Sequence, residues 1–294
     1  MPVIETDKLT KYYGKVCGIE SLDLAVEHGE VFGFLGPNGA GKTTTIRLLL
    51  DLIRPTSGRA HIFGLDTNRD SLEIRKRLGY VPGDVVLYDG MTGTAFLKLM
   101  GSFRGGYDAA RIKALQERLD LDLSRQSRAY SKGNKQKIAI VQACAPDPEL
   151  LILDEPTSGL DPLIQKRFYD LILEEKERGK TVFFSSHILP EVERVCDRVG
   201  MVREGHLVAV ERVSDLKHKK VRRMEVIFSR QVAVDELALP GMEIVSLSDN
   251  HAELRISGNI AAVLQKLAGL PVEDMSFPEA SLEDTFMQYY GGAK

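Results

Sequence analysis

The chain has 294 residues, of which 43% are hydrophobic, and its formal net charge at pH 7 is -3. This length suits one large domain plus a small one, and so small a net charge gives no global attraction to nucleic acid, which we therefore exclude as a partner. No run approaches the roughly 18 to 20 apolar residues of a membrane-spanning helix, so we expect no direct membrane insertion.

The first chemical signal along the chain is a glycine-rich loop. "GPNGAGKT", residues 36–43, matches G-x-x-x-x-G-K-[ST] between the apolar run "VFGFL" and the helix-like "TTTIRLLLDLI". Its glycines allow backbone N–H groups to face inward, and the following helix start adds positive potential, so a polyphosphate is the matching ligand. Lys42 can reach the terminal phosphates, and the Thr43 hydroxyl suits Mg²⁺. The candidate binding residues are Gly36, Pro37, Asn38, Gly39, Ala40, Gly41, Lys42, Thr43 and Thr44.

Apolar runs bounded by Gly or Pro alternate with helix-like stretches and indicate an α/β domain with a buried sheet. Residues 84–145 break this alternation, because helical patterns follow one another there without a convincing strand, so we expect a helical subdomain. Near its end stands "YSKGNKQKIAI", residues 130–140, which is lysine-rich and then abruptly apolar. Taken alone, this segment is a solvated helix start, a nucleic-acid patch, or half of a phosphate site.

Two carboxylates follow the next apolar run. In "LLILDEPTSGLD" the run ends at Asp154 and Glu155, an expensive position for charge unless a cation or a reaction uses it. Side chains alternate along a strand, so the pair should diverge, with Asp154 near Mg²⁺ and Glu155 near the attacking water. His187, at the end of "TVFFSSH", is a candidate contact for a terminal phosphate. The alternative is that the two acids are solvated at a strand exit and the histidine is structural.

The last third of the chain changes character. "RVGMVREGHLVAV" predicts a hairpin around Glu204 and Gly205. The basic run of residues 217–223 is more typical of a solvated linker than of a nucleic-acid or lipid patch. We expect a boundary near Asp215 and a small C-terminal α+β domain over residues 216–294, with strand, strand, helix and strand patterns. The three cysteines are widely spaced and odd in number, which indicates a reducing compartment.

Taken in order, "KYYG", "GPNGAGKT", "YSKGN", "LLILDEP", "SGLD" and "SSH" resemble the motifs of ABC transporter nucleotide-binding subunits over about residues 3–215. The resemblance implies a P-loop NTPase core with an antiparallel β subdomain and a helical subdomain within residues 1–215, and ATP with Mg²⁺ as ligands. It implies that residues 36–43 are the Walker A loop, that Asp154 and Glu155 end Walker B, and that His187 is the switch histidine. Ser158 to Asp161 would form the D-loop, with Asp161 among the nucleotide contacts. Tyr13 would stack on adenine, or could equally be an edge-strand residue.

Residues 130–134 fall where the family has its signature motif, usually LSGGQ. In the family two cassettes pair head to tail, so Ser131 and Gly133 of one chain would cap ATP held by the other in a homodimer. The helix start there has free N–H groups that favour an anion. Two positions depart from the family: Lys132 adds positive charge to the signature, and Gly83, followed by Asp84, replaces the usual glutamine.

Family members drive a separate transmembrane permease, to which "DVVLYDGMTGTAFLKL" would help to dock. Its apolar residues Met91, Phe96 and Leu97 could equally be helical core. The tail "PEASLEDTFMQYY" resembles ABC-2 type exporters. The expected function is therefore an ATP-binding and ATP-hydrolysing subunit that powers export, located in the cytoplasm on the membrane face through its permease.

Three other functions are weighed against this one. A P-loop GTPase is disfavoured because "NKQK" places Lys137 where the guanine-reading N-K-x-D has its aspartate. The main alternative is a soluble ABC ATPase with a regulatory, nucleic-acid or ribosome-related role, but such proteins typically carry tandem cassettes or a long coiled coil, and this chain has no sustained heptads. A non-catalytic module is favoured by Gly83 and opposed by the full set of phosphate-loop, carboxylate and histidine residues.

Overall fold

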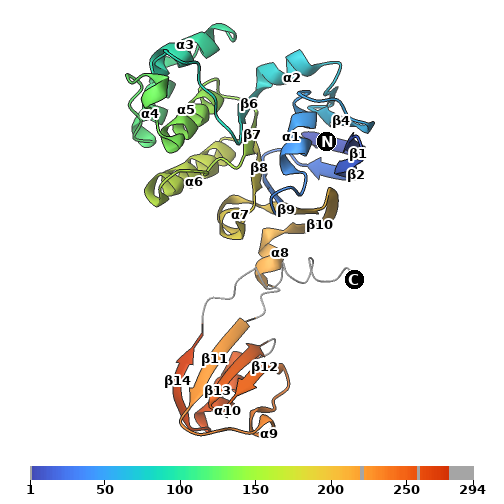
Figure 1. Cartoon of the computed structure of the whole chain (residues 1–294), viewed down its shortest axis with the longest axis vertical. Coiled ribbons are helices and arrows are strands. Elements are labelled where there is room, and N and C mark those ends of the chain that lie inside the picture. The colour runs from blue at the N-terminus through green and yellow to red at the C-terminus, as the bar shows by residue number, and fades with distance from the viewer. Residues whose placement is uncertain (1, 219–221, 257–258, 278–294) are drawn as a thin grey trace. The chain divides into compact units, whose positions relative to one another are not determined.

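A computed structural model of the chain describes residues 2–218, 222–256 and 259–277 (Figure 1). It divides into two compact units, residues 1–213 and 214–294. The strands of the first unit are β1 (Ile4–Tyr13), β2 (Val16–Val26), β3 (Val31–Leu35), β4 (Ser57–Ile62), β5 (Leu65–Asp66), β6 (Leu78–Val81), β7 (Leu150–Asp154), β8 (Thr181–Ser186), β9 (Arg198–Arg203) and β10 (His206–Arg212). Its helices are α1 (Lys42–Leu49), α2 (Ser71–Arg77), α3 (Gly93–Ser102), α4 (Ala109–Arg118), the 3-10 helix η1 (Ser127–Ala129), α5 (Lys132–Cys144), α6 (Pro162–Glu177) and α7 (Leu189–Val195), and α8 (Val213–His218) begins at the boundary.

The central sheet has the strand order β10-β9-β3-β8-β7-β6 and is parallel except for β10. Every residue of β3, β7 and β8 is buried, as expected for parallel strands that are covered on both faces. The register places Leu35 beside Ser186 and Ser185 beside Asp154, so three strands end together at the carboxyl edge. The predicted α/β class with a buried parallel sheet is confirmed.

A second, antiparallel sheet with the order β2-β1-β4-β5 shares a hydrophobic core with α1. Ile4, Leu22 and Ile62 from its strands pack in the same cluster as Ile46 and Leu49 of the helix. In Figure 1 these strands and α1 lie on one side of the central sheet, and α3, α4 and α5 lie on the other. The central strands therefore carry a β layer and a helical layer at opposite sides.

The helical layer occupies the long interval between β6 and β7. Residues 82–149, all of which the structure describes, contain α3, α4, η1 and α5 and no strand longer than a single bridge. Side chains cap all three α-helices: Thr92 accepts from the Ala95 N–H, Asp108 from the Ala110 N–H and Ser131 from the Asn134 N–H.

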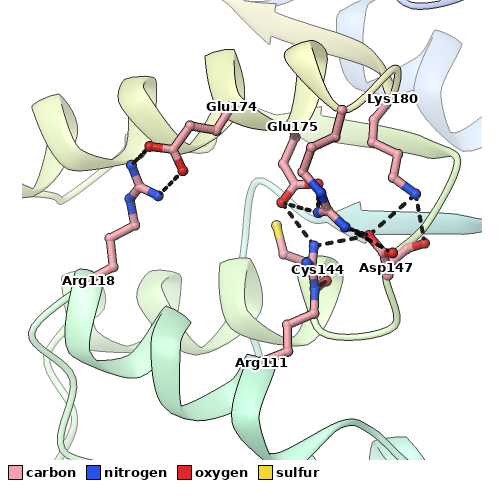
Figure 2. A network of polar contacts seen from close by, with 8 residues as sticks. Arg111, Arg118, Cys144, Asp147, Glu174, Glu175 and Lys180 are labelled. Atoms are coloured by element: carbon pink, nitrogen blue, oxygen red, sulfur yellow. Dashed lines mark hydrogen bonds and ion pairs between the residues drawn. The ribbon is translucent and has the colours of Figure 1, made fainter.

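A polar network joins this layer to α6 (Figure 2). Arg118 of α4 pairs with Glu174. Arg111, about two turns earlier on the same helix, binds Glu175 at 2.9 Å and the carbonyl of Cys144 at 2.8 Å. Asp147, in the turn after α5, lies 3.3 Å from Lys180. The network holds α4 and the end of α5 against the C-terminal half of α6.

The second unit contains β11 (Arg222–Phe228), α9 (Val234–Leu237), β12 (Met242–Ser248), β13 (His251–Ile256), α10 (Ile260–Ala268) and β14 (Val272–Ser276). Its antiparallel sheet has the order β12-β13-β11-β14, and alternate residues of β11 and β13 pack with Val263 and Leu267 of α10. This is an α+β arrangement, and it has one more strand before α10, and one more short helix, α9, than the sequence pattern indicated. The tail "PEASLEDTFMQYY" and Lys219 and Lys220 of the basic run lie outside the described residues.

The cysteines and the helix lengths bear on the expected compartment and on membrane insertion. Cys17, Cys144 and Cys196 are all free thiols. Within the described ranges, every helix is too short or too polar to cross a bilayer.

Candidate active site

The glycine-rich loop joins the buried strand β3 to α1. Gly41, at the N-cap of α1, has φ 109° and approaches β2 so closely that a Cβ there would lie 2.6 Å from the Gly18 carbonyl oxygen. Only glycine fits this position. Lys42 is buried, and its Nζ donates to the carbonyl oxygens of Gly36 at 2.8 Å and Pro37 at 3.1 Å, which places the ammonium group inside the loop.

Asp154 ends β7 and is 1% exposed. Its Oδ2 accepts from the Thr43 hydroxyl at 2.9 Å and its Oδ1 from the Ser185 hydroxyl at 2.7 Å. Within the described residues it has no ion pair, so a buried carboxylate is held by hydroxyl groups alone. Burial and the nearby charge of Asp154 raise the pKa of Tyr80 to about 12.

This donor set fits a hard divalent cation. Mg²⁺ prefers octahedral oxygen ligands at about 2.0–2.1 Å, so two adjacent ligands lie about 3 Å apart. The Thr43 and Asp154 oxygens have this spacing at 2.9 Å. A cation would also balance the buried charge. Thr43 and Asp154 are therefore the residues that could hold Mg²⁺.

The side chains of Glu155 and Asp154 have different partners, as expected, but alternation along a strand is not the reason. The strand stops at Asp154, and Glu155 has a left-handed backbone with φ 46°, so the turn, rather than strand alternation, redirects its side chain. Its Oε1 lies 3.3 Å from Lys42 Nζ and 3.2 Å from His187 Nδ1. His187 directly follows β8 and is half-exposed. Lys42, Glu155 and His187 thus form one connected group at the carboxyl edge.

Tyr13, at the end of β1, is 45% exposed and lies close to the start of α1. The position that a Cβ on Gly18 would occupy is 3.0 Å from the Tyr13 ring and 3.2 Å from the Thr44 methyl group. Lys11 Nζ lies 5.3 Å from the centre of the ring. An exposed aromatic face beside the phosphate loop is suited to stacking on a base.

The "YSKGN" segment begins α5 and packs on the turn that follows Glu155. Ser131 is the exposed N-cap of α5. A Cβ on Gly133 would lie 2.4 Å from the Gly159 carbonyl oxygen, and the Lys132 stem covers Gly159. Gln136 donates to the Pro156 carbonyl at 3.0 Å.

Ser131 and Gly133 do not join the group formed by Lys42, Asp154 and Glu155. In the part of the chain that the structure describes, no hydrogen bond or ion pair links them to residues 36–44. Asp161 is the N-cap of α6, where its carboxylate accepts from the Ile164 N–H at 3.0 Å. Among the described residues, the start of α5 therefore makes no polar contact with the phosphate loop of its own chain.

Two residues of the site escaped the sequence reasoning. Ser185 donates to Asp154, and Glu191 on α7 accepts hydrogen bonds from Thr157 and Ser186, which adjoin the site loops. The signal for Ser185 was present, because "TVFFSS" ends an apolar strand with hydroxyl residues, but its partner depends on strand register. For Glu191 the sequence offers no signal, because an acid in the first turn of a helix is common.

Comparison with known proteins agrees with this geometry. Residues 19–158 match the ABC transporter family. The chain is 36% identical over 300 residues to the bacitracin transport ATP-binding protein BcrA of Bacillus licheniformis, which covers 99% of this chain and 98% of BcrA. It is 32% identical over 319 residues to the daunorubicin/doxorubicin resistance ATP-binding protein DrrA of Streptomyces peucetius, covering 96% and 97%.

Solved structures show the same fold. The ATP-binding subunit of an ABC transporter has a TM-score of 0.68 at 32% identity, over 74% of this chain and 92% of that one. A dimeric bacterial ABC transporter cassette has a TM-score of 0.66 at 25% identity, over 71% and 98%. The expected P-loop NTPase fold is confirmed. The chain belongs to the ATP-binding subunits of ABC transporters, and it is an ATPase.

Proposed function

We propose that this subunit hydrolyses Mg-ATP at two equivalent composite sites of a homodimer, and that hydrolysis drives export through a separate transmembrane permease. One observation carries the proposal. Lys42, Thr43, Asp154, Glu155 and His187 converge at one edge of the sheet, whereas the exposed start of α5 has no phosphate loop of its own chain to serve. A second copy supplies the missing half.

The metal half of the site rests on Thr43 and Asp154. When bound, Mg²⁺ neutralises charge on the terminal phosphates. Asp154 is prepared for this ligand because its other oxygen is already fixed by Ser185 at 2.7 Å. Gly83 contributes no side chain here, although a Cβ at that position would lie only 3.5 Å from Asp154 Oδ2. A side chain at the position of the family's glutamine would therefore begin in ordinary van der Waals contact with Asp154.

The hydrolytic half rests on Glu155 and His187. Glu155 accepts a proton from the attacking water or orients it, and its 3.2 Å contact holds His187 Nδ1. The other ring nitrogen, Nε2, is left for a terminal phosphate, to which it donates when the imidazole ring carries both protons. The Lys42 ammonium, held by two loop carbonyls, interacts with the same phosphates.

The remaining contacts come from the loop, Tyr13 and the partner copy. Residues 36–44 surround the phosphates with backbone N–H groups, and Tyr13 stacks on adenine. The partner's signature segment supplies Ser131 and Gly133 at the N-terminus of α5, where the helix dipole favours the terminal phosphate. Asp161, already fixed as a helix cap, reaches the dimer interface with the rest of the D-loop.

An apolar surface near the site suits the permease. Val86 is 86% exposed and Tyr88 59%, and both lie in the segment that leaves β6 beside Gly83. Tyr88 packs near Phe96 of α3, and Arg104, two residues after the end of α3, donates to the Arg75 carbonyl of α2 at 2.6 Å. The exposed large apolar side chains of these neighbouring segments are Leu72, Val86, Tyr88 and Phe103. Phe96 and Leu97 are buried and belong to the core.

The names of relatives support the proposed direction of transport and location. BcrA and DrrA, which this chain matches over nearly its whole length, are named for bacitracin transport and for daunorubicin and doxorubicin resistance. An exporter subunit on the cytoplasmic face of the membrane fits both names. The cargo is then selected by the permease.

Mixing two inactive variants tests the composite site. Lys42→Ala and Ser131→Ala each damage both sites of a homodimer, but a heterodimer contains one site with both residues intact. With random pairing the mixture recovers up to about a quarter of wild-type activity per chain, because half of the dimers are mixed and each has one of two sites. Activity equal to the sum of the two separate variants would contradict capping by a partner.

A further inference from the structure

Glu191 is a buried carboxylate that connects the two loops carrying Glu155 and His187. It lies in the first turn of α7 and is 5% exposed. Its Oε1 accepts from the Thr157 hydroxyl at 2.6 Å and the Tyr169 hydroxyl at 3.1 Å. Its Oε2 accepts from the Ser186 hydroxyl at 2.6 Å. One carboxylate therefore collects donors from three different segments.

The two short bonds reach positions next to the hydrolytic residues. Thr157 stands two residues after Glu155, and Ser186 directly precedes His187. The Ser186 hydroxyl also accepts from the Ile188 N–H at 2.9 Å, and the Ser186 carbonyl accepts from the Gly36 N–H at 3.3 Å. Glu191 thus fixes the loop that carries His187 relative to both the Glu155 turn and the phosphate loop.

Burying the Glu191 carboxylate is unfavourable for stability, so we expect the position of the two loops to have a function. Among the described residues Glu191 has no ion pair, and a buried carboxylate without a cation is unfavourable compared with an apolar side chain of similar size. Burial and the nearby charge of Glu191 raise the pKa of Tyr169, so the Tyr169 hydroxyl keeps the proton that it donates to Glu191. Three hydroxyl donors bind the two carboxylate oxygens of Glu191 and fix their positions.

We propose that Glu191 is a positioning residue for ATP hydrolysis: by holding Thr157 and Ser186, it sets the distance between the Glu155 carboxylate and the His187 ring. The proposal rests on the hydrolytic roles assigned to Glu155 and His187 above. Glu191 itself touches neither reacting atoms nor nucleotide. Its effect is therefore on turnover and not on the binding of ATP, which depends on the phosphate loop.

Glu191→Gln and Glu191→Ala test this assignment in the full-length chain. Glutamine keeps one acceptor oxygen and loses the other, and alanine loses both. We expect kcat to fall by about tenfold or more in Glu191→Ala, less in Glu191→Gln, with KM for ATP within about threefold of wild type. Misplaced groups reduce the rate of the chemical step without weakening the contacts of bound ATP.

Glu175→Gln is the matched control. Glu175 is equally buried at 4% and also accepts from several side chains, but its partners Arg111 and Arg178 belong to the network of Figure 2. We expect this variant to lower the melting temperature at an unchanged kcat. Tyr169→Phe removes the one Glu191 donor that adjoins neither loop and should also retain kcat.

Coupling to His187 separates positioning from general loss of structure. If Glu191 acts through His187, then Glu191→Ala reduces kcat much less in a His187→Ala background than in wild type. Should Glu191→Ala not fold, Thr157→Val and Ser186→Ala each remove one bond and should each lower kcat at constant KM. Unchanged kcat in folded variants, or equal losses in the Glu175→Gln control, would overturn the proposal.

The parallel variant Glu155→Gln distinguishes a failure of the positioning role from a failure of the proposed hydrolytic roles. If Glu155→Gln abolishes turnover while Glu191→Ala has no effect, the site assignment stands and the positioning role is wrong. If Glu155→Gln itself retains turnover, the proposed hydrolytic roles are wrong, and the positioning role fails with them.

Discussion

A methyl group on Gly133 would lie 2.4 Å from the carbonyl oxygen of Gly159, although real Cβ atoms stay beyond 3.0 Å. Gly133→Ala therefore forces the start of α5 and the turn after Glu155 apart by at least the difference of 0.6 Å. The new methyl group would be attached to the backbone of α5 and would meet a backbone carbonyl, and the Lys132 stem already covers Gly159. Movement of a side chain therefore cannot remove the clash. The substitution displaces the segment that, in our account, caps ATP on the partner chain.

The size of this displacement fixes the expected loss. A misplacement of about 1 Å can cost roughly 100-fold in rate, so 0.6 Å or more should lower kcat/KM by about 10- to 100-fold, or about 1.4–2.7 kcal/mol in transition-state stabilisation. The phosphate loop of the same chain is untouched. Binding of ATP to the monomer should therefore stay within about twofold of wild type.

Steady-state ATPase assays and nucleotide titration together check this prediction. Gly269→Ala is the control, because a Cβ there meets only the Lys266 carbonyl oxygen at an ordinary 3.5 Å and Gly269 lies in the second unit. It should leave both quantities unchanged. Wild-type turnover in Gly133→Ala, or a parallel loss of ATP binding, would refute the reasoning.

Three further predictions concern the metal site, the ion network and the thiols. Gly83→Gln places an amide side chain beside Asp154. In a Mg²⁺ titration, the apparent Mg²⁺ affinity of the Gly83→Gln variant should be about tenfold higher than that of the Gly83→Ala variant. Equal titration curves for the two variants would contradict this. Hydrogen bonds from Arg118 hold the pKa of Glu174 below its ordinary value, so their contribution to stability is present above about pH 4.5 and disappears as the pH falls through the lower folded-state pKa. The stability difference between wild type and Glu174→Gln, about 0.2–1 kcal/mol at pH 7 for this half-exposed pair, should therefore vanish in acid, as urea unfolding at several pH values would show. Burial raises the pKa of Cys144 to about 12 and also raises that of Cys196, so a thiol reagent at pH 8 should modify only Cys17 in the native chain and all three thiols in denaturant.

The phosphate loop and the strand-end residues could be predicted because their signals are local. A glycine pattern between a strand and a helix specifies an anion site, and acids at the end of an apolar run need a cation. Parallel strands end at the same edge, so the convergence of Asp154, Glu155 and His187 with Lys42 follows from the fold class. What sequence could not provide was the turn at Glu155, where a left-handed backbone rather than alternation separates the two acids.

The contacts that could not be predicted from the sequence all join segments that are far apart in the chain. They depend on strand register or on how closely two backbone segments pack. Ser185 reaches Asp154, 31 positions earlier in the chain, because β7 and β8 pair in one register. Glu191 meets Thr157 and Ser186 only after α7 packs beneath both loops. The approach of Gly133 to Gly159 is likewise invisible in composition, since any small residue satisfies the pattern but only hydrogen fits the space.

Glu155→Gln tests the central claim most directly, because it removes the acid while keeping the shape of the site. Its ATP-dependent oligomeric state should be measured by light scattering on a size-exclusion column, alongside turnover. We predict that turnover is lost, that ATP is still bound, and that a stable dimer forms with ATP and dissociates when ATP is removed. A variant that keeps wild-type turnover, or that binds ATP and stays monomeric, would contradict the account.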